Sequence, residues 1–101
     1  MKPLEGITVM EFSTMITASF AAMMMAEQGA RVIKVEPIDV GDPMRYIGTN
    51  KAGIAALFAN CNRGKRSIRV NIKEESGQAL IHEMIPQVDI FIHNFRPGVM
   101  D

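Results

Sequence analysis

Four short runs of β-branched and aromatic residues constrain the fold of this chain more than any other feature. They cover residues 7–12, 32–36, 67–71 and 89–93. Each run has the length and composition of a buried strand, and polar or helix-forming stretches separate one run from the next. We therefore expect four strands rather than a helical bundle.

Helical patterns connect these runs in pairs. Residues 18–28 are strong helix formers and apolar nearly all round, so we expect a buried helix that ends at Gly29. Glu74 and Glu75 favour the start of another helix, which Pro86 should end. Its apolar residues keep to one stripe, formed by Leu80, Ile81, Met84, Ile85 and Val88.

Between the second and third runs, residues 37–50 read as a loop and residues 53–59 as a short helix. The resulting order, β-α-β-loop-β-α-β, predicts an α/β layer with a largely parallel sheet. Ligands of such sheets bind at the carboxyl ends of the strands. These ends correspond to segments 13–17, 36–45, 71–73 and 93–98.

Composition narrows the function classes. The 101 residues carry 11 Lys+Arg and 11 Asp+Glu, which excludes a generally basic nucleic-acid binder and an acidic tail. A single cysteine, Cys61, excludes an intrachain disulfide framework and favours a reducing, cytoplasmic location. Two histidines and one cysteine exclude the usual four-ligand zinc site unless carboxylates contribute. The apolar stretch 16–26 is too short for a membrane span, which needs about 20 residues.

Charge gathers in one segment. Five of the eleven cations lie between residues 63 and 73, with no acidic residue among them. This local excess suggests a phosphate-bearing partner, although a solvated basic loop explains it equally well. RNA is disfavoured because no aromatic residues alternate with the cations to stack bases.

Isolated polar residues leave alternatives open. Glu36, after a β-α-β unit, is placed to hold a ribose hydroxyl, but residues 13–18 contain no glycine, which disfavours a nicotinamide dehydrogenase. Asp42 and Arg45 are spaced for a surface ion pair, with a catalytic acid as the sharper alternative for Asp42. We interpret His82 as solvent-facing, and His93 as structural rather than catalytic. We interpret Cys61 as an inert thiol rather than a nucleophile. The run Met23 to Met25 is typical of adaptable core or interface packing.

Five segments, taken in order, resemble one family. They are Leu4–Val9, Glu27–Pro37, Gly41–Arg45, Asn62–Ile68 and Asp89–Met100. Together they are similar to the N-terminal part of the class III CoA-transferases, a family that includes formyl-CoA and carnitine CoA-transferases and α-methylacyl-CoA racemase. The resemblance covers nearly the whole chain and implies a Rossmann-like domain in which two chains interlock as a homodimer. By it, residues 1–101 are an N-terminal CoA-binding α/β segment of a larger domain.

The resemblance also implies where CoA binds. Lys73 and Arg96 would meet its phosphates, and Phe95 would pack near adenine or pantetheine. Two departures matter. Ala18-Ser19 stands where many relatives have Gly-Pro, which bears on the acyl pocket. Pro37 stands where some relatives have Arg, and its side chain cannot donate a hydrogen bond. The positions that match CoA-contacting places of the family are Ile16, Thr17, Pro37, Val70, Asn71, Ile72, Lys73, Asn94, Phe95 and Arg96.

By this resemblance, the transfer reaction is covalent catalysis by one Asp. Its carboxylate attacks the acyl-CoA thioester and makes a mixed anhydride, releasing CoA. The Asp then takes CoA as an aspartyl thioester and passes it to the acceptor acid. By the resemblance that Asp lies downstream of residue 101, so we expect no catalytic residue in this chain and no activity from it alone. The implied substrates are an acyl-CoA and a carboxylic acid, with no cofactor, metal, nucleic acid or membrane required. Two alternatives remain: a 2-methylacyl-CoA racemase of the same family and a non-catalytic CoA-binding module.

Overall fold

The computed structural model describes residues 2–12, 17–38, 41–42, 50–51 and 54–95. Four strands form one sheet: β1 (Thr8–Phe12), β2 (Arg31–Glu36), β5 (Arg66–Arg69) and β6 (Ile90–His93). Their order is β5-β2-β1-β6, and every pairing between neighbours is parallel. This confirms the predicted α/β layer, with strand ends that differ from the expected ones by one or two residues.

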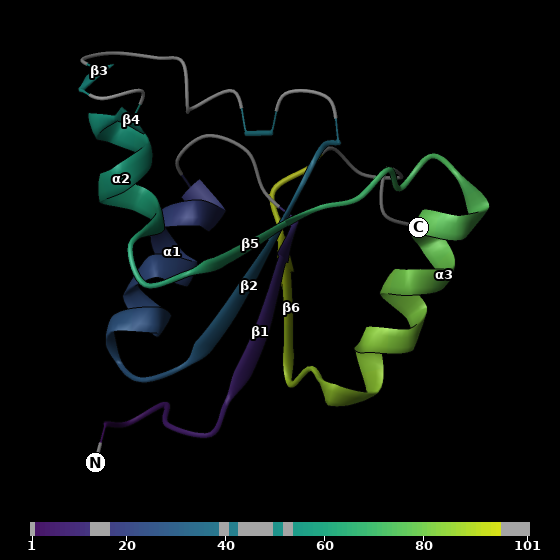
Figure 1. Ribbon diagram of the computed structural model, residues 1–101. Helices are drawn as coiled ribbons and strands as arrows, with labels where there is room; N and C mark the ends of the chain where they lie inside the picture. Colours follow the sequence, from purple (N-terminus) through teal and green to yellow (C-terminus); the bar gives the residue numbers. More distant parts are fainter. Residues whose placement is uncertain (1, 13–16, 39–40, 43–49, 52–53, 96–101) are drawn as a thin grey trace.

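Helices cover both faces of the sheet (Figure 1). On one face lie α1 (Thr17–Glu27) and α2 (Ala56–Asn62), and on the other lies α3 (Glu75–Met84). As expected from Pro86, α3 ends in a 3₁₀ turn over Ile85–Gln87. A small antiparallel pair, β3 (Asn50–Lys51) and β4 (Ile54–Ala55), precedes α2. That pair was not predicted, and α2 begins three residues later than the expected helix.

Alternation along the strands produces two apolar cores, because successive side chains point to opposite faces. Toward α1, Val9 and Val32 pack with Ala22 and Ala30. Toward α3, the buried cluster is Met10, Phe12, Val35 and Val70. Full burial of such a side chain contributes roughly 1.5–3 kcal/mol, so these clusters hold the two helical layers against the sheet.

Helix α1 is less buried than its sequence suggests. Ala18, Ser19, Ala22 and Met23 are buried, and Gly29 ends the helix region with a φ of +104°, as predicted for a C-terminal glycine. However, Phe20 and Met24 are 47% and 46% exposed. The expectation of a wholly buried helix is therefore wrong, because the sheet covers one face of α1 and leaves these two side chains on the other.

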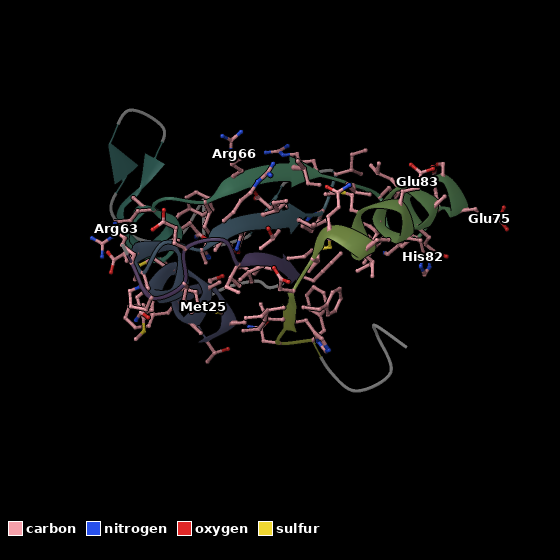
Figure 2. The ribbon with its side chains drawn as sticks, turned by 90° about the horizontal axis from the view of Figure 1, so that it is seen from below. Met25, Arg63, Arg66, Glu75, His82 and Glu83 are labelled. Atoms are coloured by element: carbon pink, nitrogen blue, oxygen red, sulfur yellow. The ribbon has the colours of Figure 1, made fainter. Side chains whose placement is uncertain are left out.

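The apolar stripe of α3 is also narrower than expected. Ile81, Met84 and Val88 pack against the Met10 cluster, whereas Leu80 and Ile85 are 45% and 38% exposed. His82 is exposed, as predicted, and Figure 2 shows it on the opposite side of α3 from Glu83. Within the described ranges, no helix has both the length and the apolar character needed to cross a bilayer.

Candidate functional site

The strand order fixes where a ligand can enter. Counted in chain order, the strands of the sheet run third-second-first-fourth, so the order reverses between β1 and β6. In open α/β sheets, ligands bind outside the carboxyl ends of the strands near such a reversal. Asn94, just after β6, donates from Nδ2 to the Thr17 Oγ1 at the start of α1, at 3.1 Å. This hydrogen bond links the two elements that flank the reversal.

A cavity of about 300 Å³ opens at this edge of the sheet. That volume is at the lower end of the range for small-molecule sites, which is about 300–1,000 Å³. Its walls combine apolar side chains with one lysine and one buried carboxylate. The lining residues are Phe12, Val35, Glu36, Pro37, Ile38, Val70, Asn71, Ile72, Lys73 and Phe95.

The turn after β5 is held in place by hydrogen bonds to its backbone. The Asn71 carbonyl accepts from Glu74 N at 3.2 Å, and the Asn71 Oδ1 accepts from Lys73 N at 3.1 Å. Gln78, in the first turns of α3, donates from Nε2 to the Ile72 carbonyl at 2.9 Å. Helix α3 therefore sets the position of Lys73 at the cavity.

Close approach of α3 to this turn depends on Gly77. A Cβ atom built on Gly77 would lie 2.0 Å from the Asn71 carbonyl oxygen. No side chain fits at that distance, so the glycine lets the helix backbone rest directly on the turn.

Aromatic residues on and after β6 contact two residues that line the cavity, Phe12 and Phe95. Phe91 stacks at a tilt on Phe12, with ring centroids 5.0 Å apart. His93 accepts from Phe95 N at its Nδ1, at 3.2 Å, and the His93 and Phe95 rings lie 6.0 Å apart. These contacts give His93 a local role in shaping the chain at Phe95, which lines the cavity.

A group of buried charges lies behind the cavity, on the α1 face of the sheet. Lys34 Nζ is 2.9 Å from the Glu11 Oε2 and 2.9 Å from the Asp42 Oδ2, and all three side chains are at most 1% exposed. Ser19, from α1, donates to the Glu11 Oε2 at 3.0 Å and accepts from Lys34 Nζ at 3.0 Å. Each charge is thus partnered, as burial requires.

Lys65 joins this group from the segment before β5. Its Nζ lies 2.6 Å from the Glu11 Oε1, and it donates to the Ser19 carbonyl and the Asn62 Oδ1, each at 2.8 Å. Burial lowers the pKa of Lys65 below its ordinary value, and the Glu11 carboxylate opposes that effect.

Glu36 and Asp42 connect the buried charges to the cavity. The Glu36 Oε1 accepts from Asp42 N at 2.7 Å, and its Oε2 accepts from the Ser67 hydroxyl. Both Glu36 oxygens therefore accept hydrogen bonds from the protein, rather than standing ready for a ribose. Asp42 is fully buried on Lys34, so the expectation of a surface pair is wrong for Asp42. Arg45 lies outside the described residues.

Comparison with known proteins decides the family. Residues 4–101 match the family described as CoA-transferase family III. The chain belongs to this family.

Curated relatives in CoA-transferase family III cover almost the whole chain. The acetyl-CoA:oxalate CoA-transferase of Acetobacter aceti is 37% identical, over 98% of this chain and 25% of the relative. The succinyl-CoA–D-citramalate CoA-transferase of Chloroflexus aurantiacus is 37% identical, over 99% and 25%. The human succinyl-CoA:glutarate CoA-transferase is 38% identical, over 96% and 22%. The chain thus spans about a quarter of the length of these relatives.

Solved structures agree with this assignment. A CaiB/BaiF family protein from Brucella suis superposes with a TM-score of 0.89 at 35% identity, over 99% of this chain and 28% of that one. A hypothetical protein from Mycobacterium tuberculosis gives a TM-score of 0.89 at 31% identity, over 99% and 27%. The parallel sheet with flanking helices is therefore the fold of CaiB/BaiF proteins.

The residues singled out by the family resemblance gather at the cavity to a large extent. Thr17 and Asn94 contact each other beside the β1–β6 reversal, and Ile16 and Arg96 lie outside the described residues. The others line the cavity: Pro37, Val70, Asn71, Ile72, Lys73 and Phe95.

The cations of residues 63–73 do not form one surface. Arg63 pairs with Glu27 at 2.7 Å on the exterior, and Lys65 is buried on Glu11. Arg66 points away from the edge strand β5 (Figure 2), whereas Lys73 lines the cavity. The predicted local excess of positive charge is thus divided among separate places. Nearby, Cys61 is buried, which fits an inert thiol.

Sequence reasoning missed the buried charges at Glu11, Lys34 and Lys65. A usable signal existed for the first two, because each interrupts an apolar run that forms a strand of a parallel sheet. Such strands are covered on both faces, so a charge within one must find a buried partner. Among the described residues, no cluster of three or more His, Cys, Asp or Glu has the arrangement of a metal site.

Proposed function

We propose that this chain is the CoA-binding N-terminal part of an enzyme that transfers CoA from an acyl-CoA to a carboxylic acid. The observation that carries the proposal is the cavity at the carboxyl ends of the sheet. Six of the residues that match CoA-contacting places of the family line that single cavity, although they come from three separate stretches of the sequence. Membership of CoA-transferase family III supports the same function.

The chemistry of the walls suits a ligand with both apolar and anionic parts. Phe12, Val35 and Phe95 offer surfaces for an adenine ring or a pantetheine arm. Lys73 brings a cation that is suited to a phosphate. The hydrogen bonds from Lys73 N to the Asn71 Oδ1 and from Gln78 to the Ile72 carbonyl hold the backbone at Lys73 before a ligand binds.

Transfer itself needs a carboxylate nucleophile, which we place outside residues 1–101. In our proposal this chain binds and orients CoA, the catalytic Asp comes from further along the polypeptide, and the working protein is a cytoplasmic homodimer. The relatives named above are CoA-transferases, which favours transfer over the racemase reaction.

Calorimetric titration of the full-length protein with CoA tests the binding site. Lys73→Ala and Arg96→Ala should each weaken CoA binding by about tenfold to a hundredfold, because a well-placed charge-assisted hydrogen bond contributes about 1.5–3 kcal/mol. Arg63→Ala is the matched control, since Arg63 is 58% exposed and pairs with Glu27. Repetition at two salt concentrations and with dephospho-CoA shows which phosphate is bound. Affinities of both variants within about twofold of the parent would show that the site assignment is wrong.

The reaction is tested separately by mixing the full-length protein with an acyl-CoA and a carboxylate acceptor. Formation of the acceptor's CoA thioester is the expected result. Inversion at the α-carbon of a 2-methylacyl-CoA, with exchange of its α-proton for a solvent proton and no transfer, would identify a racemase instead. CoA binding without either reaction would identify a non-catalytic module.

A further inference from the structure

The loop after β2 is tied to the buried charges at both its ends. It leaves the strand at Glu36 and returns at Asp42, whose N–H donates to the Glu36 Oε1 at 2.7 Å. The Asp42 Oδ2 lies 2.9 Å from the Nζ of Lys34, which precedes Glu36 by two residues on β2. A third contact, from Gly41 N to the Pro37 carbonyl at 3.2 Å, closes the loop on itself.

The same loop forms part of the cavity wall. Glu36, Pro37 and Ile38 all line the cavity. Glu36 is the first of the two points at which the loop is tied, and Pro37 and Ile38 follow it before the second point, Asp42. Ile38 is 51% exposed, so apolar packing alone does not fix it. The hydrogen bonds from Gly41 N to the Pro37 carbonyl and from Asp42 N to Glu36 are contacts that can hold this wall.

Stability alone is a weak reason for this arrangement. A buried ion pair gains little over apolar side chains of similar volume, because both charges must first leave water. Such a pair instead dictates geometry, since Lys34 and Asp42 must meet within hydrogen-bond distance once they are buried.

We propose that Lys34 and Asp42 are positioning residues that hold the Glu36–Ile38 wall in the conformation that receives CoA. The inference rests on the proposed function for the identity of the ligand. Neither residue touches the ligand in this proposal. Lys34 is not a cavity-lining residue, and it acts through Asp42 and the loop.

The test is the double substitution Lys34→Met/Asp42→Leu in the full-length protein. It removes one charge of each sign. Glu11 loses its contact with Lys34 at 2.9 Å but keeps Lys65 as a partner at 2.6 Å. The matched control is Glu27→Leu/Arg63→Met, which removes an ion pair of 2.7 Å on the exterior, where the side chains are 52% and 58% exposed.

Two readouts separate positioning from a merely structural role. Amide hydrogen exchange of the ligand-free protein should accelerate about tenfold or more in residues 37–42 and stay unchanged in β6. Strand β1 is not a control region, because the substitution also removes the Lys34–Glu11 ion pair. CoA affinity should fall about tenfold, and in turnover the KM for acyl-CoA should rise while kcat changes by less than about twofold. The control variant should match the parent in every readout.

Asp42→Asn provides a second variant that keeps the side-chain shape and removes its charge. Smaller changes in the same direction are expected from it. Parental exchange in residues 37–42 and parental CoA affinity, in either folded variant, would overturn the inference. If the parent itself binds no CoA, the proposed function fails, and the exchange rates still decide whether the pair holds the loop.

Discussion

Glu11 and Lys34 require a hydrogen-bonding side chain from the helix that covers this face of the sheet. They are direct neighbours in the parallel register of β1 and β2, and both side chains point toward α1. The Ser19 Oγ, on helix α1, lies 3.0 Å from the Glu11 Oε2 and 3.0 Å from the Lys34 Nζ. A wholly apolar helix face would leave these groups short of hydrogen bonds, so Ser19 is required at this point of an otherwise apolar interface.

Lys65 makes stability depend on pH in a defined direction. Its pKa is lowered by burial from the ordinary 10.5, so the unfolded chain binds more protons between the lowered pKa and 10.5. The free energy of unfolding should therefore rise with pH across that window through this group. Urea unfolding of the parent and Lys65→Gln at several pH values measures the effect, because groups that do not interact with Lys65 cancel in the difference. A parent that loses stability relative to the variant as pH rises would contradict the prediction.

At the scale of elements, Gly77 lets α3 dock on the turn that carries Lys73. Gly77→Ala improves intrinsic helix propensity by about 1 kcal/mol, yet its Cβ would lie 2.0 Å from the Asn71 carbonyl oxygen. We expect the clash to win, with a lower free energy of unfolding and weaker CoA binding. Ser76→Ala, at an exposed neighbouring position, should be tolerated. Denaturant unfolding and CoA titration measure both effects, and a stabilised Gly77→Ala protein would show that the helix can move away at no cost.

Strands and helices were predictable here because their patterns are local. The four apolar runs became the four parallel strands, and Gly29 and Pro86 ended their helices as expected. The patterns could not show which side of a helix packs against the sheet. Helix α1 is apolar nearly all round, so its sequence does not tell which side meets the sheet, and Phe20 and Met24 proved exposed. The β3–β4 pair offers only two residues per strand, too few for a periodic signal.

The candidate site was predictable to the extent that it follows from topology. Parallel strands bring their carboxyl ends to one edge, which is where the cavity opens. The Lys34–Asp42 contact was not foreseen, because nearness in sequence favoured Arg45 as the partner of Asp42. The burial of Asp42 beside β2 depends on tertiary packing, which the spacing of residues along the chain does not reveal.

At the scale of the whole molecule, the described residues that line the cavity offer no carboxylate free to act as a nucleophile. The cavity's described lining includes one carboxylate, Glu36, and both its oxygens accept hydrogen bonds from the protein. We therefore predict that the 101-residue polypeptide made by itself does not transfer CoA. An assay with an acyl-CoA and a carboxylate acceptor measures this, with the full-length protein as the positive control. Turnover by the short polypeptide would place the nucleophile within these residues.

The same polypeptide should self-associate when made alone. Phe20 and Met24 expose apolar surface on α1, while Ile90 and Phe91 are 36% and 42% exposed on β6, at the end of the described sheet. Exposed apolar patches of this kind favour association in water because contact removes them from solvent. Light scattering across a concentration series should show a mass above that of one chain, rising with concentration. Phe20→Lys/Met24→Lys should lower it by charging one of these surfaces, whereas Glu75→Lys, on the outer side of α3, should not. A monomeric parent at every concentration would show that these side chains are ordinary surface.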